Sequence, residues 1–250
     1  MEDYINNFKK FDKIIVYDFG LGEGGIGDYL KFFMIILTEC MSNNMQIYQK
    51  INNIEIEKYI KFKYDFFNIT EDEISKLKNV TIKKPHHYDN KDTYNGNISL
   101  NEVFIFDTIV KLNVKNILHS LPTNYISIHL RMGDKFLETD KKYVLSKDKD
   151  DERKYSEENM YNFIEDNKNK NIIFFSDNNN YKLNIKNKYK HIIITEAHVG
   201  HTSLCNTTNK QVLDTITEFY VLSNSQLIYS ASDSGFSNMA SKFNNVKHIF

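Results

Sequence analysis

The segment Tyr125-Ile-Ser-Ile-His-Leu-Arg-Met-Gly-Asp-Lys135 carries the strongest signal in this 250-residue chain. Its apolar alternation predicts a strand, and side chains repeat every second residue along a strand, so His129 and Arg131 share a face. The guanidinium of arginine matches phosphate oxygens, and ligands of open α/β sheets bind beyond the carboxyl ends of the strands. The segment therefore predicts a site for a phosphorylated ligand. The alternative is a surface ion pair for Arg131 and a core position for His129.

Predicted strands and helices alternate on both sides of this segment, and this pattern is typical of an α/β protein with parallel sheets. Strands are expected at 13–19, 45–49, 79–83, 125–130, 171–175, 191–195, 226–230 and 246–250. Helices are expected at 28–40, 71–77, 100–113, 156–166, 210–223 and 234–242. The stretch 118–124, which contains Pro122, is the best candidate for a domain boundary, and it divides the chain into residues 1–120 and 121–250.

The composition excludes several classes of function. With 32 basic and 33 acidic residues, the chain has no bulk attraction for nucleic acid or for an anionic membrane. Its two cysteines, Cys40 and Cys205, lie far apart in the sequence and indicate neither a zinc site nor a disulfide framework. The sequence has no apparent signal peptide and no stretch that is long and apolar enough to span a bilayer. We therefore expect a soluble, cytoplasmic protein.

Three segments together resemble the motifs of the fucosyltransferase superfamily. The first is His-x-Arg-x-Gly-Asp at 129–134, the second is Ile172-Ile-Phe-Phe-Ser-Asp177, and the third runs from Glu218 to Ala240 and contains Ser232-Asp-Ser-Gly-Phe-Ser237. The resemblance is strongest over 125–250. It implies a GT-B type fold of two Rossmann-like halves with mainly parallel sheets, with the acceptor side in 1–120 and the nucleotide-sugar site in 121–250.

The activity implied by this resemblance is an inverting transfer of fucose from GDP-fucose to a glycan hydroxyl, with no cofactor and no obligatory metal. Arg131 would neutralise the diphosphate leaving group. His129 would contact the guanine base or order the strand end. Glu218 would accept hydrogen bonds from guanine, with Asp214 as the fallback. The expected partners are a nucleotide sugar and a glycan acceptor, and no oligomeric state follows from the sequence.

The third motif also has a physical basis of its own, because it lies between a predicted strand and a predicted helix. Exposed backbone N–H groups at a helix N-terminus bind phosphate. The resemblance places Ser234 at the diphosphate, and it groups five further residues with the nucleotide site: Ser232, Gly235, Phe236, Lys135 and Asp177. The alternative is an ordinary capped helix start.

The acceptor hydroxyl requires a base, and the loop after Arg131 offers Asp134 and Glu138. Glu138 resembles a glutamate of the α-1,6 branch of the family, although the spacing in this chain is one residue shorter. His198 and His201 are further candidates, because histidine accepts protons near neutral pH.

The glycine-rich segment Gly20-Leu-Gly-Glu-Gly-Gly-Ile-Gly27 follows a predicted strand and precedes a predicted helix. It matches a dinucleotide-binding pattern, so an NAD-dependent oxidoreductase is an alternative. That class needs an acid at the end of the second strand, where this chain has Lys50 and Asn52. Under the fucosyltransferase interpretation, Gly24, Gly25 and Gly27 let the backbone approach the sugar nucleotide or the acceptor. A non-catalytic nucleotide-sugar-binding module is the remaining alternative.

Overall fold

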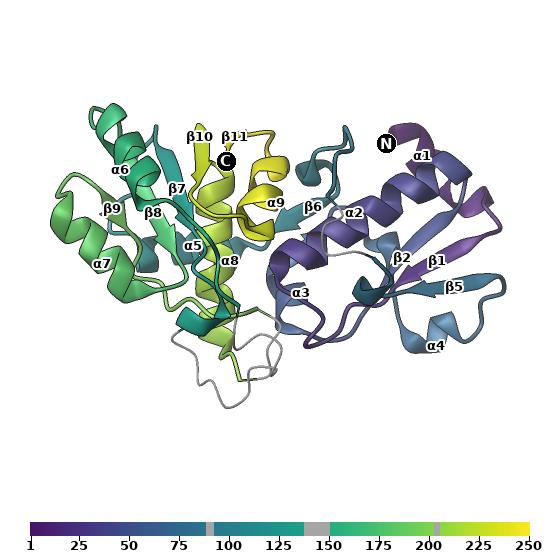
Figure 1. The fold of residues 1–250 in the computed structure, drawn as a ribbon. Helices are drawn as coiled ribbons and strands as arrows, with labels where there is room; N and C mark the ends of the chain where they lie inside the picture. The colour runs from purple at the N-terminus through teal and green to yellow at the C-terminus, as the bar shows by residue number, and fades with distance from the viewer. Residues whose placement is uncertain (89–92, 138–150, 203–205) are drawn as a thin grey trace.

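The computed structural model describes residues 1–88, 93–137, 151–202 and 206–250, and its two α/β halves lie side by side (Figure 1). The N-terminal half contains a four-stranded sheet in which every pairing is parallel. In sheet order its strands are β4 (Asn68–Ile69), β2 (Gln46–Lys50), β1 (Ile14–Tyr17) and β5 (Val80–Lys83). The central strand β1 is buried along its whole length, as its apolar sequence predicts.

The C-terminal half contains a five-stranded sheet that is also parallel throughout. In sheet order its strands are β11 (Lys247–Ile249), β10 (Leu227–Ser230), β7 (Ile126–Leu130), β8 (Ile172–Ser176) and β9 (Ile193–Ile194). The register pairs His129 with Ser230 and Leu130 with Ser176. The three sequence motifs therefore lie together at the carboxyl ends of β10, β7 and β8.

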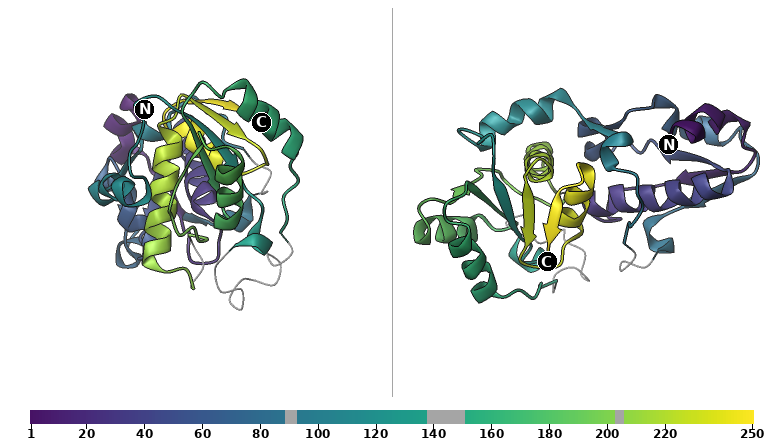
Figure 2. Two further views of the ribbon diagram at one scale, coloured as in Figure 1. Left: turned by 90° about the vertical axis from the view of Figure 1, so that its left-hand side faces the viewer. Right: turned by 90° about the horizontal axis from the view of Figure 1, so that it is seen from above.

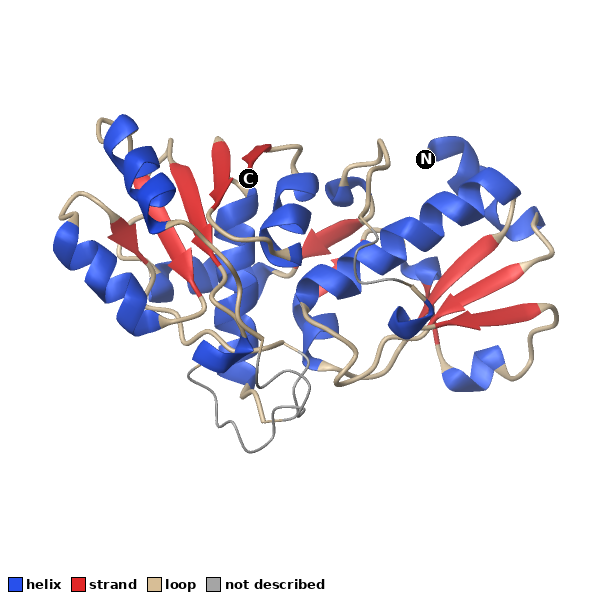
Figure 3. Cartoon of the chain, in the orientation of Figure 1, coloured by secondary structure: helices blue, strands red, loops and turns tan. Residues whose placement is uncertain are grey.

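Helices cover the faces of these sheets (Figure 3). The longer ones are α2 (Ile26–Asn43), α5 (Thr108–Ile117), α6 (Glu157–Asp166), α7 (Asn179–Lys188), α8 (Asn209–Ser223) and α9 (Gly235–Phe243). The short ones are α1 (Glu2–Asn7), α3 (Glu55–Tyr59) and α4 (Glu71–Ile74). A separate antiparallel pair joins β3 (Ile60–Phe62) to β6 (Phe104–Phe106). No helix in the described parts of the chain has the length and apolar character needed to cross a membrane.

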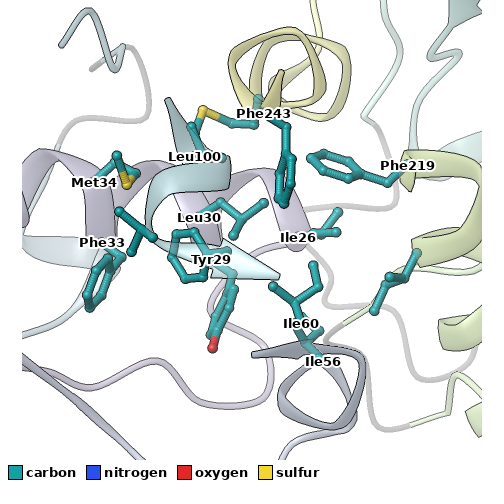
Figure 4. Close-up of a cluster of buried hydrophobic side chains, with 14 of the residues drawn as sticks. Ile26, Tyr29, Leu30, Phe33, Met34, Ile56, Ile60, Leu100, Phe219 and Phe243 are labelled. Carbon is teal, nitrogen blue, oxygen red and sulfur yellow. The ribbon is translucent and has the colours of Figure 1, made fainter. Parts of the chain in front are cut away.

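Helix α2 connects the two halves through a shared apolar cluster. The right-hand view of Figure 2 shows α9 between the C-terminal sheet and α2. In Figure 4, Phe219 of α8 and Phe243 of α9 lie close to the side of α2 that carries Ile26 and Leu30. All four side chains are buried. Because burying one such side chain contributes roughly 1.5–3 kcal/mol, this cluster holds α2 against α8 and α9 of the C-terminal half.

The α/β class and the mainly parallel sheets expected from the sequence are confirmed. The helix predicted for 100–113 is wrong, because strand β6 interrupts it and α5 begins only at Thr108. Phe104 and Phe106 are buried while Ile105 is exposed, which is a strand pattern that was hidden within an apparent helical period. Asp107 then caps α5 by accepting a hydrogen bond from the N–H of Ile109 (3.0 Å).

The position of the domain boundary stays a prediction. Helix α5 lies before that boundary in the sequence but packs against α8 of the C-terminal half. Asn113 of α5 donates hydrogen bonds to Asp214 and Thr217 of α8, each at 3.0 Å.

Candidate active site

A cleft of about 1120 Å³ lies between the two halves. The loop at 22–28 lines one side of it, and the ends of β7 and β8 and the start of α9 line the other. Among the residues singled out in the sequence, those that line the cleft are Gly24, Gly25, Gly27, His129, Arg131, Asp134, Asp177, His201, Glu218, Ser234, Gly235 and Phe236. The carboxyl ends of parallel strands thus bring together the three motifs at 129–134, 172–177 and 218–240.

Two carboxylates hold the guanidinium of Arg131 in the cleft. Its Nη1 donates to Oδ2 of Asp177 at 2.5 Å, and its Nη2 is paired with Asp134. A third carboxylate, that of Asp151, lies 3.9 Å from Nη2. An arginine guanidinium has further N–H donors beyond those two pairs. The side chain is therefore oriented before any ligand binds, and it retains donors for one.

Asp177 organises the whole turn that follows β7. Its two oxygens accept hydrogen bonds from the backbone N–H groups of Met132 (2.8 Å) and Gly133 (3.0 Å), in addition to the guanidinium of Arg131. Gly133 has a φ of +118°, and a Cβ there would lie 2.3 Å from the carbonyl oxygen of Asp151. Only glycine fits this position, which explains the Gly of the His-x-Arg-x-Gly-Asp motif.

Ser232 and Lys135 do not reach the cleft. The hydroxyl of Ser232 is fully buried, accepts from the backbone N–H of Arg131 (2.9 Å) and donates to its carbonyl oxygen (2.7 Å). These two hydrogen bonds join the segment that follows β10 to the segment that follows β7, so the Ser232 hydroxyl fixes the backbone of Arg131. Lys135 extends toward the surface, where its Nζ pairs with Glu152 at 2.8 Å.

His129 forms an uncharged wall of the cleft. Its ring stacks on Phe236, with centroids 5.1 Å apart and planes 20° apart. Burial lowers the pKa of His129 to about 3, and the nearby charges of Arg131 and His248 act in the same direction. Its Nδ1 is buried and has no hydrogen-bond partner among the described residues. At neutral pH the imidazole is uncharged.

Two helix N-termini meet at the cleft through a pair of glycines. A Cβ at Gly27 of α2 would lie 2.7 Å from the carbonyl carbon of Gly235 of α9. Gly235 itself faces open space, and Ser234 caps α9 by accepting a hydrogen bond from the N–H of Phe236 (3.3 Å). The positive end of the α9 dipole therefore opens toward the same space as Arg131.

Side chains of the protein accept hydrogen bonds from backbone N–H groups at the N-terminus of α2. The carboxylate of Asp28 accepts from the N–H of Gly25 (3.3 Å), and the hydroxyl of Thr202 accepts from the N–H of Ile26 (2.9 Å). Gly24 has a φ of +133°, and a Cβ there would lie 2.7 Å from Asp28. Gly24 is therefore required by the local backbone conformation, whereas Gly27 is the glycine that permits the close approach of α2 to α9.

Glu218 is buried at the wall of the cleft and is paired with a residue that the sequence analysis did not single out. Its Oε1 lies 3.1 Å from Nζ of Lys182 on α7, and it also accepts from the hydroxyl of Thr195. Burial raises the pKa of Glu218, and the positive charge of Lys182 opposes that shift. Asp214 lies away from the cleft and accepts from Nζ of Lys210 (2.5 Å) and from the N–H of His198 (3.1 Å).

Of the candidate bases, His201 lines the cleft and His198 does not. Glu138 lies outside the described residues. Asp134 also lines the cleft, and its carboxylate is paired with the guanidinium of Arg131. Within the described ranges, no three histidine, cysteine or acidic side chains converge as metal ligands would.

The dinucleotide-binding alternative has no support at the end of β2. Lys50 lies at the position where a ribose-binding acid would be expected. Its Nζ pairs with Glu71 at 2.5 Å and lies 3.7 Å from Asp18. Asn52 donates to Asp18 at 2.7 Å. The nearby polar groups are therefore engaged in a local network around Asp18.

No family model matches the chain, and no curated protein matches it. Solved structures do match. NodZ alpha-1,6-fucosyltransferase, in a crystal soaked with GDP-fucose, superposes with a TM-score of 0.53 and 8% identity, over 93% of this chain and 92% of that one. The apo-form of POFUT1 superposes with a TM-score of 0.55 and 12% identity, over 96% and 97% of the two chains. At these identities the likeness establishes the fold, which is the GT-B fold of the fucosyltransferases.

Proposed function

We propose that this chain is an inverting glycosyltransferase that transfers fucose from GDP-fucose to a glycan hydroxyl. The observation that carries the proposal is that Arg131, at the end of β7, and Ser234, at the N-terminus of α9, line one cleft between the two halves. The fold supports it too, because the matching structure of NodZ alpha-1,6-fucosyltransferase comes from a crystal soaked with GDP-fucose. His129 and Phe236 would flank the bound nucleotide.

The chemistry follows from where negative charge develops. The oxygen of the acceptor hydroxyl attacks C1 of fucose, the bond from C1 to the phosphate oxygen breaks, and GDP leaves with the electron pair of that bond. Negative charge grows on the β-phosphate as this bond breaks. The guanidinium of Arg131 and the N–H groups at the start of α9 would stabilise that charge, and fixed donors in such a position contribute strongly to catalysis.

The proton of the acceptor hydroxyl must pass to a base. Glu138 stays the proposed base. Asp134 would act through Arg131, because its carboxylate is paired with the guanidinium. His201 lines the cleft near Gly25, with its Nε2 3.8 Å from the position of a Cβ there, and it is the alternative base.

The test measures GDP binding by calorimetry and GDP release from GDP-fucose in the presence of a panel of glycan acceptors. We expect the wild-type protein to bind GDP and release it from the donor, and Arg131→Ala to lose turnover by at least about a hundredfold. Arg131→Lys should recover little activity, because lysine lacks the planar fork. Lys61→Ala is the matched control, since that lysine forms only a surface pair with Asp107 (2.6 Å).

The outcomes separate the alternatives. GDP binding without turnover on any acceptor would indicate a non-catalytic nucleotide-sugar module. Full activity in Arg131→Ala would contradict the proposed role of the guanidinium. Tight binding of NAD in place of GDP would favour the oxidoreductase alternative.

A further inference from the structure

Lys182 forms a fully buried ion pair directly behind the wall of the cleft. It lies on α7, its side chain is 1% exposed, and the side chain of its partner Glu218 is 3% exposed. Nζ of Lys182 donates to Oε1 of Glu218 and to Oγ1 of Thr195, each at 3.1 Å. The hydroxyl of Thr195 in turn donates to the same Oε1. Glu218 lines the cleft, whereas Lys182 does not.

Fold stability alone is a poor explanation for this pair. Removing two charges from water costs about as much as their attraction returns, so well-packed apolar residues often stabilise an interior at least equally well. The other buried residue of α7 is Ile185, which is apolar. An apolar residue at 182 would complete the same packing. A buried lysine opposite a cleft-lining carboxylate therefore suggests a role in orienting that carboxylate.

The hydrogen bonds from Lys182 and Thr195 fix Oε1 of Glu218 and thereby orient the whole carboxylate group. Both donors act on Oε1, so the carboxyl group cannot rotate without losing a charged hydrogen bond and a hydroxyl hydrogen bond. An ionised carboxylate only accepts hydrogen bonds, and since both protein donors act on Oε1, the lone pairs of Oε2 are the ones that the N–H donors of a ligand would meet. Guanine presents two adjacent N–H donors on its Watson–Crick edge, whereas uracil presents one N–H between two carbonyl acceptors.

We propose that Lys182 is a positioning residue that holds Glu218 as an oriented acceptor for the paired N–H donors of guanine, and that it thereby sets the preference of the cleft for guanine over uracil nucleotides. This inference rests on the proposed function and adds to it the residue that determines base preference. Lys182 acts through Glu218 and does not contact the nucleotide itself.

The pair also has a pH signature that a purely structural role lacks. Burial raises the pKa of Glu218, Lys182 and Thr195 lower it, and Asp214, one turn earlier on α8, raises it. Replacing Lys182 by an apolar residue removes the largest opposing charge, so the pKa of Glu218 rises further. A protonated carboxyl group presents a donor to the guanine N–H groups. The variant should therefore bind GDP poorly at low pH and recover affinity as the pH rises.

The experiment measures the dissociation constants of GDP and UDP by calorimetry at pH 6, 7 and 8. The wild-type protein should prefer GDP at all three values. Lys182→Met should lose about 10- to 100-fold of that preference at pH 6 and regain part of it as the pH rises toward 8. Lys182→Arg should restore the preference, because it returns the charge. Lys186→Met is the matched control, since Lys186 lies on the same helix but bonds to the carbonyls of Lys190 (2.8 Å) and Ile192 (2.5 Å).

Thr195→Val provides a second test that keeps the lysine in place, for use if Lys182→Met does not fold. It removes one of the two donors to Oε1 with little change in volume, and it should reduce the preference for GDP by a smaller factor. A folded Lys182→Met or Thr195→Val protein that keeps the wild-type ratio of GDP to UDP affinity overturns the inference. So does an equal loss in Lys186→Met. If wild-type protein releases GDP from GDP-fucose while the lysine variant keeps its preference, only this inference fails. If wild-type protein binds neither nucleotide, the proposed function fails.

Discussion

Replacing His129 by glutamine should make the protein less sensitive to acid. His129 is 5% exposed, and burial lowers its pKa from 6.5 to about 3. In the unfolded chain the same side chain titrates near its ordinary value. Between these two pKa values the unfolded state therefore binds more protons than the folded state, and the free energy of unfolding falls as the pH falls through this window.

The magnitude follows from the width of the window. At pH 5 the solution is about 1.5 units below the unfolded pKa and still above the folded one, so His129 lowers the free energy of unfolding by about 2 kcal/mol relative to pH 8. The effect grows toward pH 3, where the folded state also takes up the proton. Glutamine places a polar group in the same space but does not titrate. The variant therefore lacks the pH-dependent decrease in the free energy of unfolding that His129 causes.

The assay is urea denaturation at pH 8 and pH 5 for both proteins. The decrease in the free energy of unfolding between the two pH values should be about 2 kcal/mol smaller in His129→Gln than in wild type. His119→Gln removes a histidine whose side chain is 91% exposed, and it controls for the change in histidine content. An identical decrease in wild type and His129→Gln would refute the argument that burial keeps this histidine neutral.

Three further predictions concern the scaffold of the cleft. Gly27→Ala places a Cβ 2.7 Å from Gly235, so α2 and α9 must separate; we expect about 1–3 kcal/mol lower stability in urea denaturation and weaker GDP binding by calorimetry. Asp177→Asn replaces one acceptor oxygen by a donor opposite two backbone N–H groups and the guanidinium of Arg131; steady-state kinetics should give a kcat for GDP release at least about tenfold lower. Ser232→Ala removes both bonds to the backbone of Arg131 and should cost about 1–3 kcal/mol, measured by thermal unfolding. Wild-type behaviour in any one of these would show that the contact concerned is dispensable.

Much of the C-terminal half could be predicted from local sequence. Apolar runs at 126–130 and 172–176 are buried throughout, so composition alone indicated strands. Caps also marked helix starts: Ser156 accepts from the N–H of Asn159 (3.2 Å). Once the strands are parallel neighbours, their carboxyl ends share an edge, which is why Arg131 and Ser234 reach one cleft.

The features that could not be predicted from local sequence depend on contacts between residues that are distant in the sequence. Lys182 lies in a segment rich in asparagine and lysine, and only Glu218, 36 residues later, makes it a buried ion-pair partner. Ser232 was expected at the phosphate on position alone, but its hydroxyl bonds to the backbone of Arg131, 101 residues earlier. The strand β6 was missed because its pairing with β3 supplies the hydrogen bonds that a helix would otherwise provide.

The most direct test of the central claim is a crystal structure of this protein with GDP. The account predicts that the β-phosphate lies within hydrogen-bond distance of both the guanidinium of Arg131 and the backbone N–H groups at the start of α9, with the base beside Glu218. A diphosphate bound elsewhere, with Arg131 still paired only to Asp134 and Asp177, would contradict it.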